Sequence, residues 1–550
     1  MVRSFLRDAI SRLYPDTNFD ILTPPNPEMG DYSVNLAFML AKKEGKNPGD
    51  VGKDLALKLS QNEELSRYFK KIELAGAGFV NLYLSDDFLR SNLIEILEKK
   101  EEFGSGADKN FKINLEFVSA NPTGPLTVAN IRAASFGDTL ASVLRKAGYG
   151  VAKEYYINDA GNQVRLLGES IARRYLRIKG KTIDFPENLY QGEYVVDIAR
   201  EIDEKNIVDS TENFDDLVKA CRDYGVKKLL ASAKNSLNAL GIEFDVWFSE
   251  ATLHQGGEVG GALKILEKGK HIYDKDGARW LRMSDKGEED AVLVKSDGLA
   301  SYLMGDIAYT RNKFIRGFNK AINIWGADHH GDAPRLKAGV RALGYEKERL
   351  EILLHQLVFI KSGGEKQKMS KRKGEFVLLD DLLSEVNKDA IRFFFLMKDL
   401  NTHMEFDVDL AKEQSKKNPV YYIQYAYARL NSIFEKLKVE SRKLKVEEEA
   451  LELLREPEEL FLMRKMAKWP ELIGEVAGDY QIHRLAQYSY ELASRFHNFY
   501  EKHKVVQDDK KIEKARLLLC AGVALILESA LGLMGLSAPK KMIGSEKGSA

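Results

Sequence analysis

The sequence contains very little cysteine and no excess of charge of either sign. Only two cysteines, Cys221 and Cys520, occur in 550 residues. They cannot supply a disulfide framework or a cysteine-based zinc site, and we expect a protein of the reducing cytoplasm. Lys and Arg total 83, as do Asp and Glu, so the formal net charge is zero. Any nucleic-acid surface must therefore be a local patch.

The sequence also lacks a signal-like beginning. Its first residues, MVRSFLRDAISRLYP, predict an amphipathic helix rather than a secretory signal. One apolar run, residues 517–536, is long enough to span a bilayer. However, Glu528 and Ser529 interrupt it, and no second run of this kind exists. We therefore expect the central helix of a bundle and no membrane partner.

The chain length predicts three or four domains of about 150 residues each. Residues 1–105 predict a small α/β unit, which a charged and Gly/Ser-containing linker follows. Residues 106–410 alternate apolar strand runs with helical runs, which is typical of a Rossmann-type parallel sheet. The strand candidates are 113–118, 291–296, 321–328 and 353–362, and a helical insertion is expected over 160–250. Residues 411–550 predict an all-α bundle.

One segment, LEFVSANPTGPLTVANIRAASFGDTL at 115–140, joins a strand to a helix through a Pro/Gly turn. The helix is expected to begin near Thr127. Backbone N–H groups and the positive end of the helix dipole at such a junction suit a nucleotide phosphate. The segment lacks the GxGxxG and Walker patterns. Taken alone, it is more often a structural turn than a ligand site.

A second segment, KSGGEKQKMSKRKGEF at 361–376, is rich in Lys and Arg and contains two adjacent glycines. A cationic loop of this kind can close on a triphosphate and neutralise the charge of a leaving pyrophosphate. It can also be a solvated loop or a general RNA patch. The tetrapeptide Lys368-Met369-Ser370-Lys371 is much less common than a basic loop in general.

These motifs resemble those of class I aminoacyl-tRNA synthetases. More narrowly, EFVSANPTGPL, EYYINDAGNQVRLLGESI, SYLMGDIAYTRNKF, WGADHHG and HQLVFIKSGGEKQKMSKRKGEFV are similar to arginyl-tRNA synthetases. The resemblance covers essentially the whole chain. It implies an N-terminal additional tRNA-binding domain at 1–105, a catalytic domain at 106–410 and an anticodon-binding domain at 411–550. The implied partners are L-arginine, ATP with Mg²⁺, and tRNA(Arg), which the family generally binds before it activates the amino acid.

A pocket for arginine should offer carboxylates, because they pair with the planar guanidinium in a bidentate way. Tyr302 and Asp306 are four residues apart and would share one helical face. The resemblance assigns the arginine site to Glu116, Asn121, Tyr302, Asp306 and His329. It assigns ATP to Thr127, Asn130, Gly326, Asp328, Val358, Lys368, Ser370 and Lys371. For tRNA, we expect contacts from Tyr425 and Arg429 in the bundle and from Arg372 in the basic loop.

The family's usual His-x-Gly-His turn is replaced here by Thr127-Val128-Ala129-Asn130. A Thr hydroxyl and an Asn amide are also hydrogen-bond donors, and Thr127 can cap the helix. We therefore expect a working enzyme whose catalytic residues are Thr127, Asn130, Lys368 and Lys371.

Two other functions stay open. One is a non-catalytic tRNA-binding paralogue. The other is a class I synthetase for a different amino acid, although an apolar substrate would leave two buried carboxylates unpaired. We expect a monomer and no metal site, because Asp328 and His329 are neighbours that would point to opposite faces of a strand.

Overall fold

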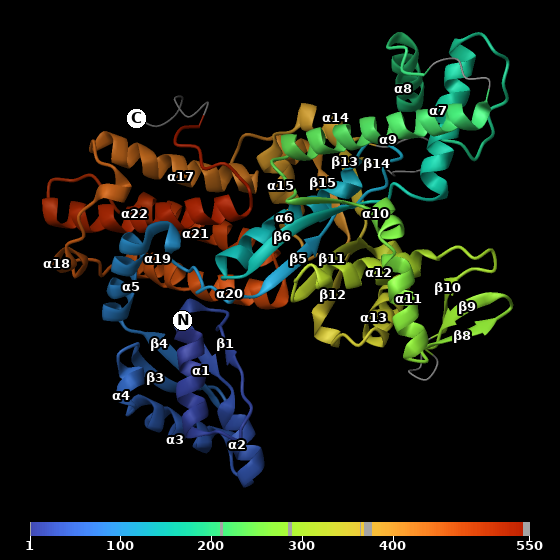
Figure 1. Ribbon diagram of the computed structural model, residues 1–550. Helices are drawn as coiled ribbons and strands as arrows, with labels where there is room; N and C mark the ends of the chain where they lie inside the picture. The colour runs from blue at the N-terminus through green and yellow to red at the C-terminus, as the bar shows by residue number, and fades with distance from the viewer. Residues whose placement is uncertain (1, 209–212, 284–288, 364, 368–376, 543–550) are drawn as a thin grey trace.

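The computed structural model describes residues 2–208, 213–283, 289–363, 365–367 and 377–542. Figure 1 shows an N-terminal unit at one end, a helical region around the C-terminal helices, and an α/β region that carries the central sheet. The predicted fold class is confirmed: a parallel-sheet domain lies between a small α/β unit and a C-terminal helical bundle.

Five parallel strands form the central sheet, in the order β12-β11-β5-β6-β7. They are β5 (Lys112–Glu116), β6 (Gly150–Ile157), β7 (Val246–Ser249), β11 (Lys320–Gly326) and β12 (Leu350–His355). Strand β5 comes first in the chain, and the later strands add on both of its sides. In such a sheet, ligands bind at the carboxyl ends of the strands, where the strand order reverses. Here that position is the edge between β5 and β11.

The strands are joined by helices, because parallel neighbours need long crossover connections. The helices between β5 and β12 are α6 (Val128–Lys146), α7 (Asn162–Ile178), α8 (Glu193–Glu204), α9 (Phe214–Ala239), α10 (Glu250–Gln255), α11 (Glu258–Lys268), α12 (Tyr302–Ile315) and α13 (Asp332–Ala342). Helices α7, α8 and α9 share a hydrophobic core of their own, which confirms the predicted helical insertion. Strand β7, at the end of that insertion, was not predicted.

Two of the strand predictions were wrong about the sheet. Strand β10 (Ala291–Val294) pairs antiparallel with β9 (Ala278–Leu281), which pairs with β8 (Ile272–Lys275), outside the central sheet. The predicted strand 353–362 is two strands, β12 and β13, and the Gln356 carbonyl between them accepts a hydrogen bond from Arg132 Nη1 (3.0 Å). After that break, β13 (Val358–Ser362) lies between β14 (Glu365–Gln367) and β15 (Met404–Asp407). A short apolar run does not indicate which sheet it joins.

The two ends of the chain flank this domain. The N-terminal unit contains α1 (Val2–Leu13), β1 (Ile21–Leu22), β2 (Tyr32–Val34), α2 (Leu36–Glu44), α3 (Pro48–Ser60), α4 (Glu63–Ser66), β3 (Phe69–Ala75), β4 (Phe79–Leu84) and α5 (Asp86–Lys99). The C-terminal region contains α14 (Leu379–Glu385), α15 (Lys388–Leu396), α16 (Val408–Lys412), α17 (Pro419–Lys436), α18 (Glu448–Leu451), α19 (Pro457–Ala467), α20 (Trp469–Asp479), α21 (His483–Lys502) and α22 (Lys510–Leu533).

Helix α22 carries the apolar run that could span a bilayer by length and composition. In the structure it packs against α17, α21 and α19, and 72% of its most apolar window is buried. The prediction of a central bundle helix is therefore confirmed. The N-terminal unit contacts the same bundle, where the Tyr32 hydroxyl donates to Glu471 at 2.7 Å.

Candidate active site

The carboxyl end of β5 is shaped by an unusual backbone. Glu116 is the last residue of the strand and is 4% exposed. Val118 and Ser119 then adopt positive φ angles of 67° and 39°, which are costly for side chains with a Cβ and turn the chain sharply. The turn brings the Ser119 hydroxyl back to Glu116, where it donates to Oε1 at 3.1 Å. The strained turn therefore fixes one oxygen of the strand-end carboxylate.

The turn that follows is held from outside by three side chains. The Tyr155 hydroxyl donates to the Ala120 carbonyl (2.9 Å), and the Tyr194 hydroxyl from α8 donates to the Thr123 carbonyl (2.7 Å). The exposed Asn121 amide donates to Gln163 at 2.7 Å. Asn121 thus lies in a loop whose shape depends on the helical insertion.

Helix α6 starts where the sequence predicted, and Thr127 is its N-cap. Asn130 Oδ1 accepts the Thr127 backbone N–H (2.9 Å) and the Thr127 hydroxyl (3.2 Å). This arrangement satisfies a helix-end donor. Asn130 bonds Thr127 through Oδ1, and its Nδ2 donates to no group among the described residues, so it is the donor that remains for a ligand.

The start of α6 is also tied to the segment that follows the basic loop. Val128 N–H donates to the Val377 carbonyl (3.1 Å), and Leu379 N–H donates to the Leu126 carbonyl (3.0 Å). These two bonds form a short antiparallel bridge around Thr127. The predicted phosphate turn and one end of the basic loop are therefore parts of one structure.

The other end of the loop is anchored on β15 and α16. Lys361 Nζ lies 2.9 Å from Asp407 Oδ2, and Gly363 N–H donates to Asp409 Oδ2 at 2.9 Å. The acidic partner raises the pKa of Lys361, chiefly through the hydrogen bond. Lys361, Asp407 and Asp409 line a depression of about 520 Å³. The predicted residues Lys368, Ser370, Lys371 and Arg372 lie outside the described residues.

Beneath the crevice, α12 and the sheet share a layer of buried charges. Lys313 Nζ lies 2.6 Å from Glu116 Oε2 and donates to Asn323 Oδ1 at 2.8 Å. Glu116 and Asn323 are neighbours across β5 and β11, and Glu116 pairs on its other side with Glu154. Glu154 in turn accepts two hydrogen bonds from the Arg316 guanidinium, at 2.6 and 2.8 Å. Each of these buried carboxylates thus has its own cation.

Asp306 is the exception in this layer. It lies on the same helix as Lys313, and no described side chain donates to its carboxylate. Burial raises the pKa of Asp306 to about 8, and the nearby Glu116 and Glu250 carboxylates add to the effect. The predicted partner Tyr302 is on α12 as expected, but its side chain is largely exposed. The Asp306 carboxyl group on α12 is therefore without an ion pair among the described residues.

Sequence reasoning missed Glu250, which starts α10 directly after β7. Its side chain is 13% exposed, and burial raises its pKa. It acts on the pKa of Asp306 and forms a hydrogen bond with Tyr156. The only sequence signal was its place after the strand VWFS, which was itself not predicted. Lys313 was also missed, although it follows Asp306 by seven residues on one helical face.

At the end of β11, the predicted ATP residues lie close together in the chain. Gly326 ends the strand, and a short 3-10 helix, η4 (Ala327–His329), follows. Asp328 and His329 are exposed, and His329 Nδ1 lies 3.1 Å from Asp332. A Cβ on Gly326 would come within 2.3 Å of the exposed Asp328 carboxylate, which would have to move aside. Val358 is buried at the start of β13, directly after the break that separates β13 from β12.

In the helical bundle, Tyr425 and Arg429 lie together as predicted. The Arg429 guanidinium donates to the Tyr425 hydroxyl (2.7 Å) and lies 4.8 Å from the ring centroids of Tyr425 and Tyr500. The Tyr421 and Tyr425 rings are nearly parallel, with centroids 6.3 Å apart. The ring of His497 packs on Tyr425 from α21, and burial lowers its pKa to about 4. This group is an aromatic platform with one cation.

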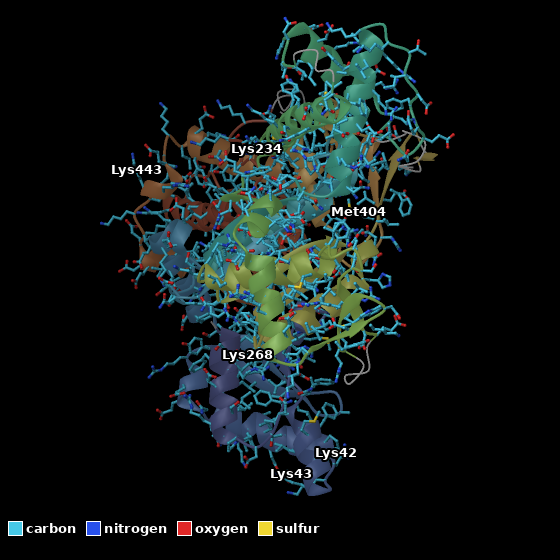
Figure 2. All side chains as sticks on the ribbon, turned by 45° about the vertical axis from the view of Figure 1, so that its right-hand side comes forward. Lys42, Lys43, Lys234, Lys268, Met404 and Lys443 are labelled. Carbon is cyan, nitrogen blue, oxygen red and sulfur yellow. The ribbon has the colours of Figure 1, made fainter. Side chains whose placement is uncertain are left out.

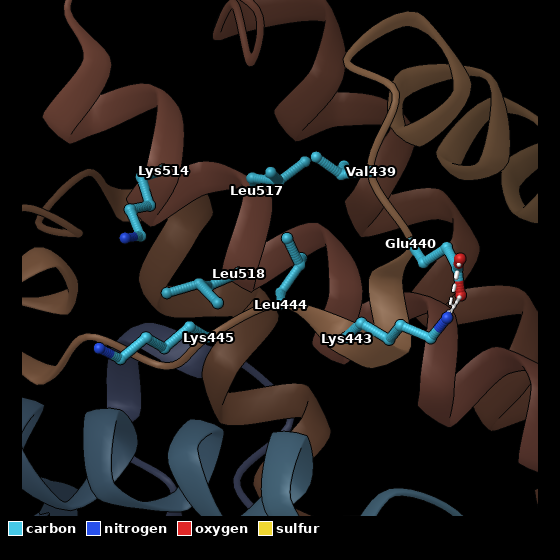
Figure 3. Close-up of a pocket in the computed structure, with 8 residues that line it drawn as sticks. All are labelled: Val439, Glu440, Lys443, Leu444, Lys445, Lys514, Leu517 and Leu518. Atoms are coloured by element: carbon cyan, nitrogen blue, oxygen red, sulfur yellow. Dashed lines mark hydrogen bonds and ion pairs between the residues drawn. The ribbon is translucent and has the colours of Figure 1, made fainter.

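A separate pocket of about 300 Å³ lies between α22 and the chain after α17 (Figure 3). Its wall contains Leu444, Leu517 and Leu518, and Lys443 pairs with Glu440 at 2.9 Å. It contains none of the predicted site residues. The carboxyl edge of the central sheet, where Glu116 and Gly326 end their strands, is the candidate active site.

Comparisons with known proteins agree with this geometry. The family described as "tRNA synthetases class I (R), catalytic domain" matches residues 92–430. "Arginyl tRNA synthetase N terminal domain" matches 1–84, and "DALR anticodon binding domain" matches 423–542. The chain is 42% identical over 547 residues to the arginine–tRNA ligase of Thermotoga maritima, covering 98% of this chain and 99% of that protein.

A second relative, the arginine–tRNA ligase of Carboxydothermus hydrogenoformans, is 42% identical, and the alignment covers 98% of each chain. The solved arginyl-tRNA synthetase of Thermus thermophilus superimposes with a TM-score of 0.80 over 98% of this chain and 100% of that one. It is 22% identical and supports the fold. The family model and the two full-length relatives show that the chain belongs to the arginyl-tRNA synthetase family of class I tRNA synthetases.

Proposed function

We propose that this chain forms arginyl-adenylate from L-arginine and ATP at the carboxyl edge of its central sheet, and then transfers arginine to the terminal adenosine of tRNA(Arg). The observation that carries the proposal is the Asp306 carboxyl group, which is half-buried and has no cation paired with it among the described residues. A bound guanidinium would give Asp306 the cation that Lys313 provides for Glu116 and Arg316 provides for Glu154. Full-length similarity to arginine–tRNA ligases supports the same reaction.

In this proposal Asp306 accepts the guanidinium, and Glu116 lies beside it. Tyr302, one helical turn before Asp306, packs along the arginine side chain when the crevice is occupied. Asn121 and His329 serve the backbone end of the amino acid, from the turn after β5 and from η4. The five residues come from β5 and the turn after it, from α12, and from η4 at the end of β11. Strands β5 and β11 flank the switch in strand order, which supports a single binding site.

ATP would occupy the adjoining half of the edge, with Gly326, Asp328 and Val358 at its nucleoside. Adenylate formation is an in-line attack of the arginine carboxylate on the α-phosphate, which depends on positioning and on stabilising developing charge. Thr127 and Asn130 lie at the helix N-terminus, where the dipole favours a phosphate. Lys368, Ser370 and Lys371 would receive the pyrophosphate. Mg²⁺ enters with ATP as part of the substrate.

The tRNA would contact both flanking units. In the bundle, Tyr425 and Arg429 suit unpaired bases and phosphates. Arg372 would serve the acceptor end. Lys42 and Lys43 end α2 and project from the far end of the N-terminal unit (Figure 2), where they suit the sugar-phosphate backbone. We further propose the division 1–105, 106–410 and 411–550, a monomer, a cytoplasmic location and no membrane partner.

The deciding experiment is aminoacylation of bulk tRNA with labelled arginine, with and without ATP, beside lysine and a mixture of the other amino acids. ATP-dependent charging by arginine alone is the expected result. If the chain binds tRNA but does not charge it, the chain is a non-catalytic paralogue, and the turn Thr127-Val128-Ala129-Asn130 no longer supports adenylate formation. Charging by another amino acid would overturn the assignment of the carboxylate crevice.

A further inference from the structure

The turn at residues 120–125 has little backbone hydrogen bonding of its own. In the described part of the chain, its backbone forms one hydrogen bond with backbone, from the Thr123 N–H to the Asn121 carbonyl at 2.7 Å. Pro122 and Pro125 have no N–H to donate. The shape of this turn therefore depends on side chains that reach it from other elements.

Tyr194, the second residue of α8, packs its ring against the turn. Its hydroxyl donates to the Thr123 carbonyl at 2.7 Å. A Cβ on Gly124 would lie 3.4 Å from that hydroxyl oxygen, and a Cβ on Gly192 would lie 2.4 Å from the ring. The glycine before α8 thus leaves the space that the ring occupies. Burial raises the pKa of Tyr194, so its hydroxyl remains a donor at neutral pH.

A second contact joins the same turn to the same helices. Helices α7, α8 and α9 project from the α/β region (Figure 1) and share a hydrophobic core, against which Tyr194 packs. The Asn121 amide donates to Gln163 of α7 at 2.7 Å. The helical insertion therefore holds the turn at two places, the Thr123 carbonyl and the Asn121 side chain, and does so from two different helices.

The turn carries a residue that the proposed function uses. Asn121 is proposed to serve the backbone end of arginine, which includes the carboxylate that attacks ATP. A reacting group that is misplaced by about 1 Å can slow a reaction about 100-fold, because the attacking atom must be close and aligned. Contacts that fix the turn should therefore affect the rate, even where they do not touch a substrate.

We infer that Tyr194 is a positioning residue for adenylate formation: its hydroxyl holds the Thr123 carbonyl and thereby fixes Asn121 at the backbone end of arginine. The inference rests on the proposed function, from which it takes the arginine site. Tyr194 acts through the turn rather than on a substrate. The competing explanation is that its hydroxyl only stabilises the packing of the insertion on the α/β region.

The test is aminoacylation by Tyr194→Phe, which keeps the ring and removes the hydroxyl. The kcat should fall about tenfold and the Michaelis constant for arginine should rise about fivefold, because the turn loses the bond that fixes it. The Michaelis constant for tRNA should stay within about twofold, since the change affects neither proposed tRNA surface. A fall in kcat with every Michaelis constant unchanged would indicate a loss of folded protein, and it would overturn the inference. Unchanged kinetics would also overturn it.

A comparison with Asn121→Ala tests the route through the turn. Asn121→Ala should raise the Michaelis constant for arginine by itself. If Tyr194 acts through Asn121, adding Tyr194→Phe to that variant should change this constant by less than about twofold, because residues that serve one interaction are not additive. Fully additive effects would show that Tyr194 does not act through Asn121, and they would overturn the inference.

Tyr224→Phe is the matched control. It removes another tyrosine hydroxyl of the insertion, which forms a hydrogen bond with Glu201 of α8. Both kcat and the Michaelis constant for arginine should stay within about twofold. If Tyr224→Phe impairs charging as much as Tyr194→Phe does, the stability of the insertion is responsible, and the inference is wrong.

The same measurements separate this inference from the proposal on which it rests. If the unmodified protein does not charge tRNA with arginine, or if Asn121→Ala leaves the Michaelis constant for arginine unchanged, the proposed arginine site is wrong and the inference falls with it. If the unmodified protein charges arginine and Asn121→Ala impairs its use, while Tyr194→Phe behaves like the unmodified protein, only the role of Tyr194 is wrong.

Discussion

The guanidinium of Arg392 lies 2.6 Å from the carboxylate of Asp138, and this contact joins α15 to the middle of α6. Arg392 is fully buried and also donates to the Met534 carbonyl (2.8 Å), directly after α22. Asp138 binds Lys153 of β6 through its other oxygen, at 2.9 Å. Helix α6 is thus linked to the end of the helical bundle through the Asp138–Arg392 ion pair and the hydrogen bond from Arg392 to Met534.

Replacing Arg392 with Met should destabilise the chain strongly. Loss of one partner leaves Asp138 in a buried site with only Lys153, and it leaves the Met534 carbonyl without its donor. We expect a loss of about 3 kcal/mol in the free energy of unfolding. The measurement is the shift of the urea midpoint. Arg200→Met, which removes an exposed pair with Asp197, should cost less than about 1 kcal/mol, and equal effects would contradict the prediction.

Arginine binding should release a proton. Burial raises the pKa of Asp306 to about 8, so this carboxyl is mostly protonated at pH 7. A bound guanidinium favours the ionised form and lowers that pKa. Arginine affinity should therefore increase as the pH rises toward 8. Calorimetric titration with arginine in two buffers of different ionisation enthalpy measures the released proton. Asp306→Asn should abolish the release, and a proton count of zero in the unmodified protein would show that Asp306 is already ionised.

The variant Asn130→Asp separates two roles of Asn130, which are to cap helix α6 and to offer a hydrogen-bond donor to the phosphates. A carboxylate still accepts the Thr127 N–H and favours a helix N-terminus, so thermal stability should stay the same or rise. The free amide donor is lost, however, and a negative charge faces the phosphates. Adenylate formation, followed by pyrophosphate exchange in the presence of tRNA, should fall at least about 100-fold. A rate within threefold of the original would mean that Asn130 only caps the helix.

The aromatic platform predicts different results for two variants of Tyr425. Tyr425→Ala removes a ring that stacks on Tyr421 and His497, and it should raise the Michaelis constant for tRNA by about 5- to 150-fold, the cost of one stacked base. Tyr425→Phe keeps the ring and loses only the bond from Arg429. It should change the constant by less than about fivefold. Equal effects of the two variants would indicate that the hydroxyl, not the stacking surface, matters.

Several parts of the site could be predicted because local sequence specifies them. Thr127 was predicted as a helix cap, since Thr is a favoured residue at the start of a helix, and the structure confirms it. The placement of Tyr302 and Asp306 on one helix follows from their spacing. The strand 291–296 was assigned to the wrong sheet, because its pairing partners lie in a hairpin that the pattern does not reveal.

The sequence by itself determined the class of fold, the helical bundle and the family, because apolar periodicity and co-linear motifs are local properties of the chain. Only the tertiary structure decided which carboxylate is free. In the sequence Glu116 and Asp306 are simply two acidic residues, yet in the structure Glu116 is paired with Lys313 and Asp306 is not. That difference arises from the register of β5 beside β11 and from the packing of α12. Burial then turns a small difference in distance into a large difference in charge.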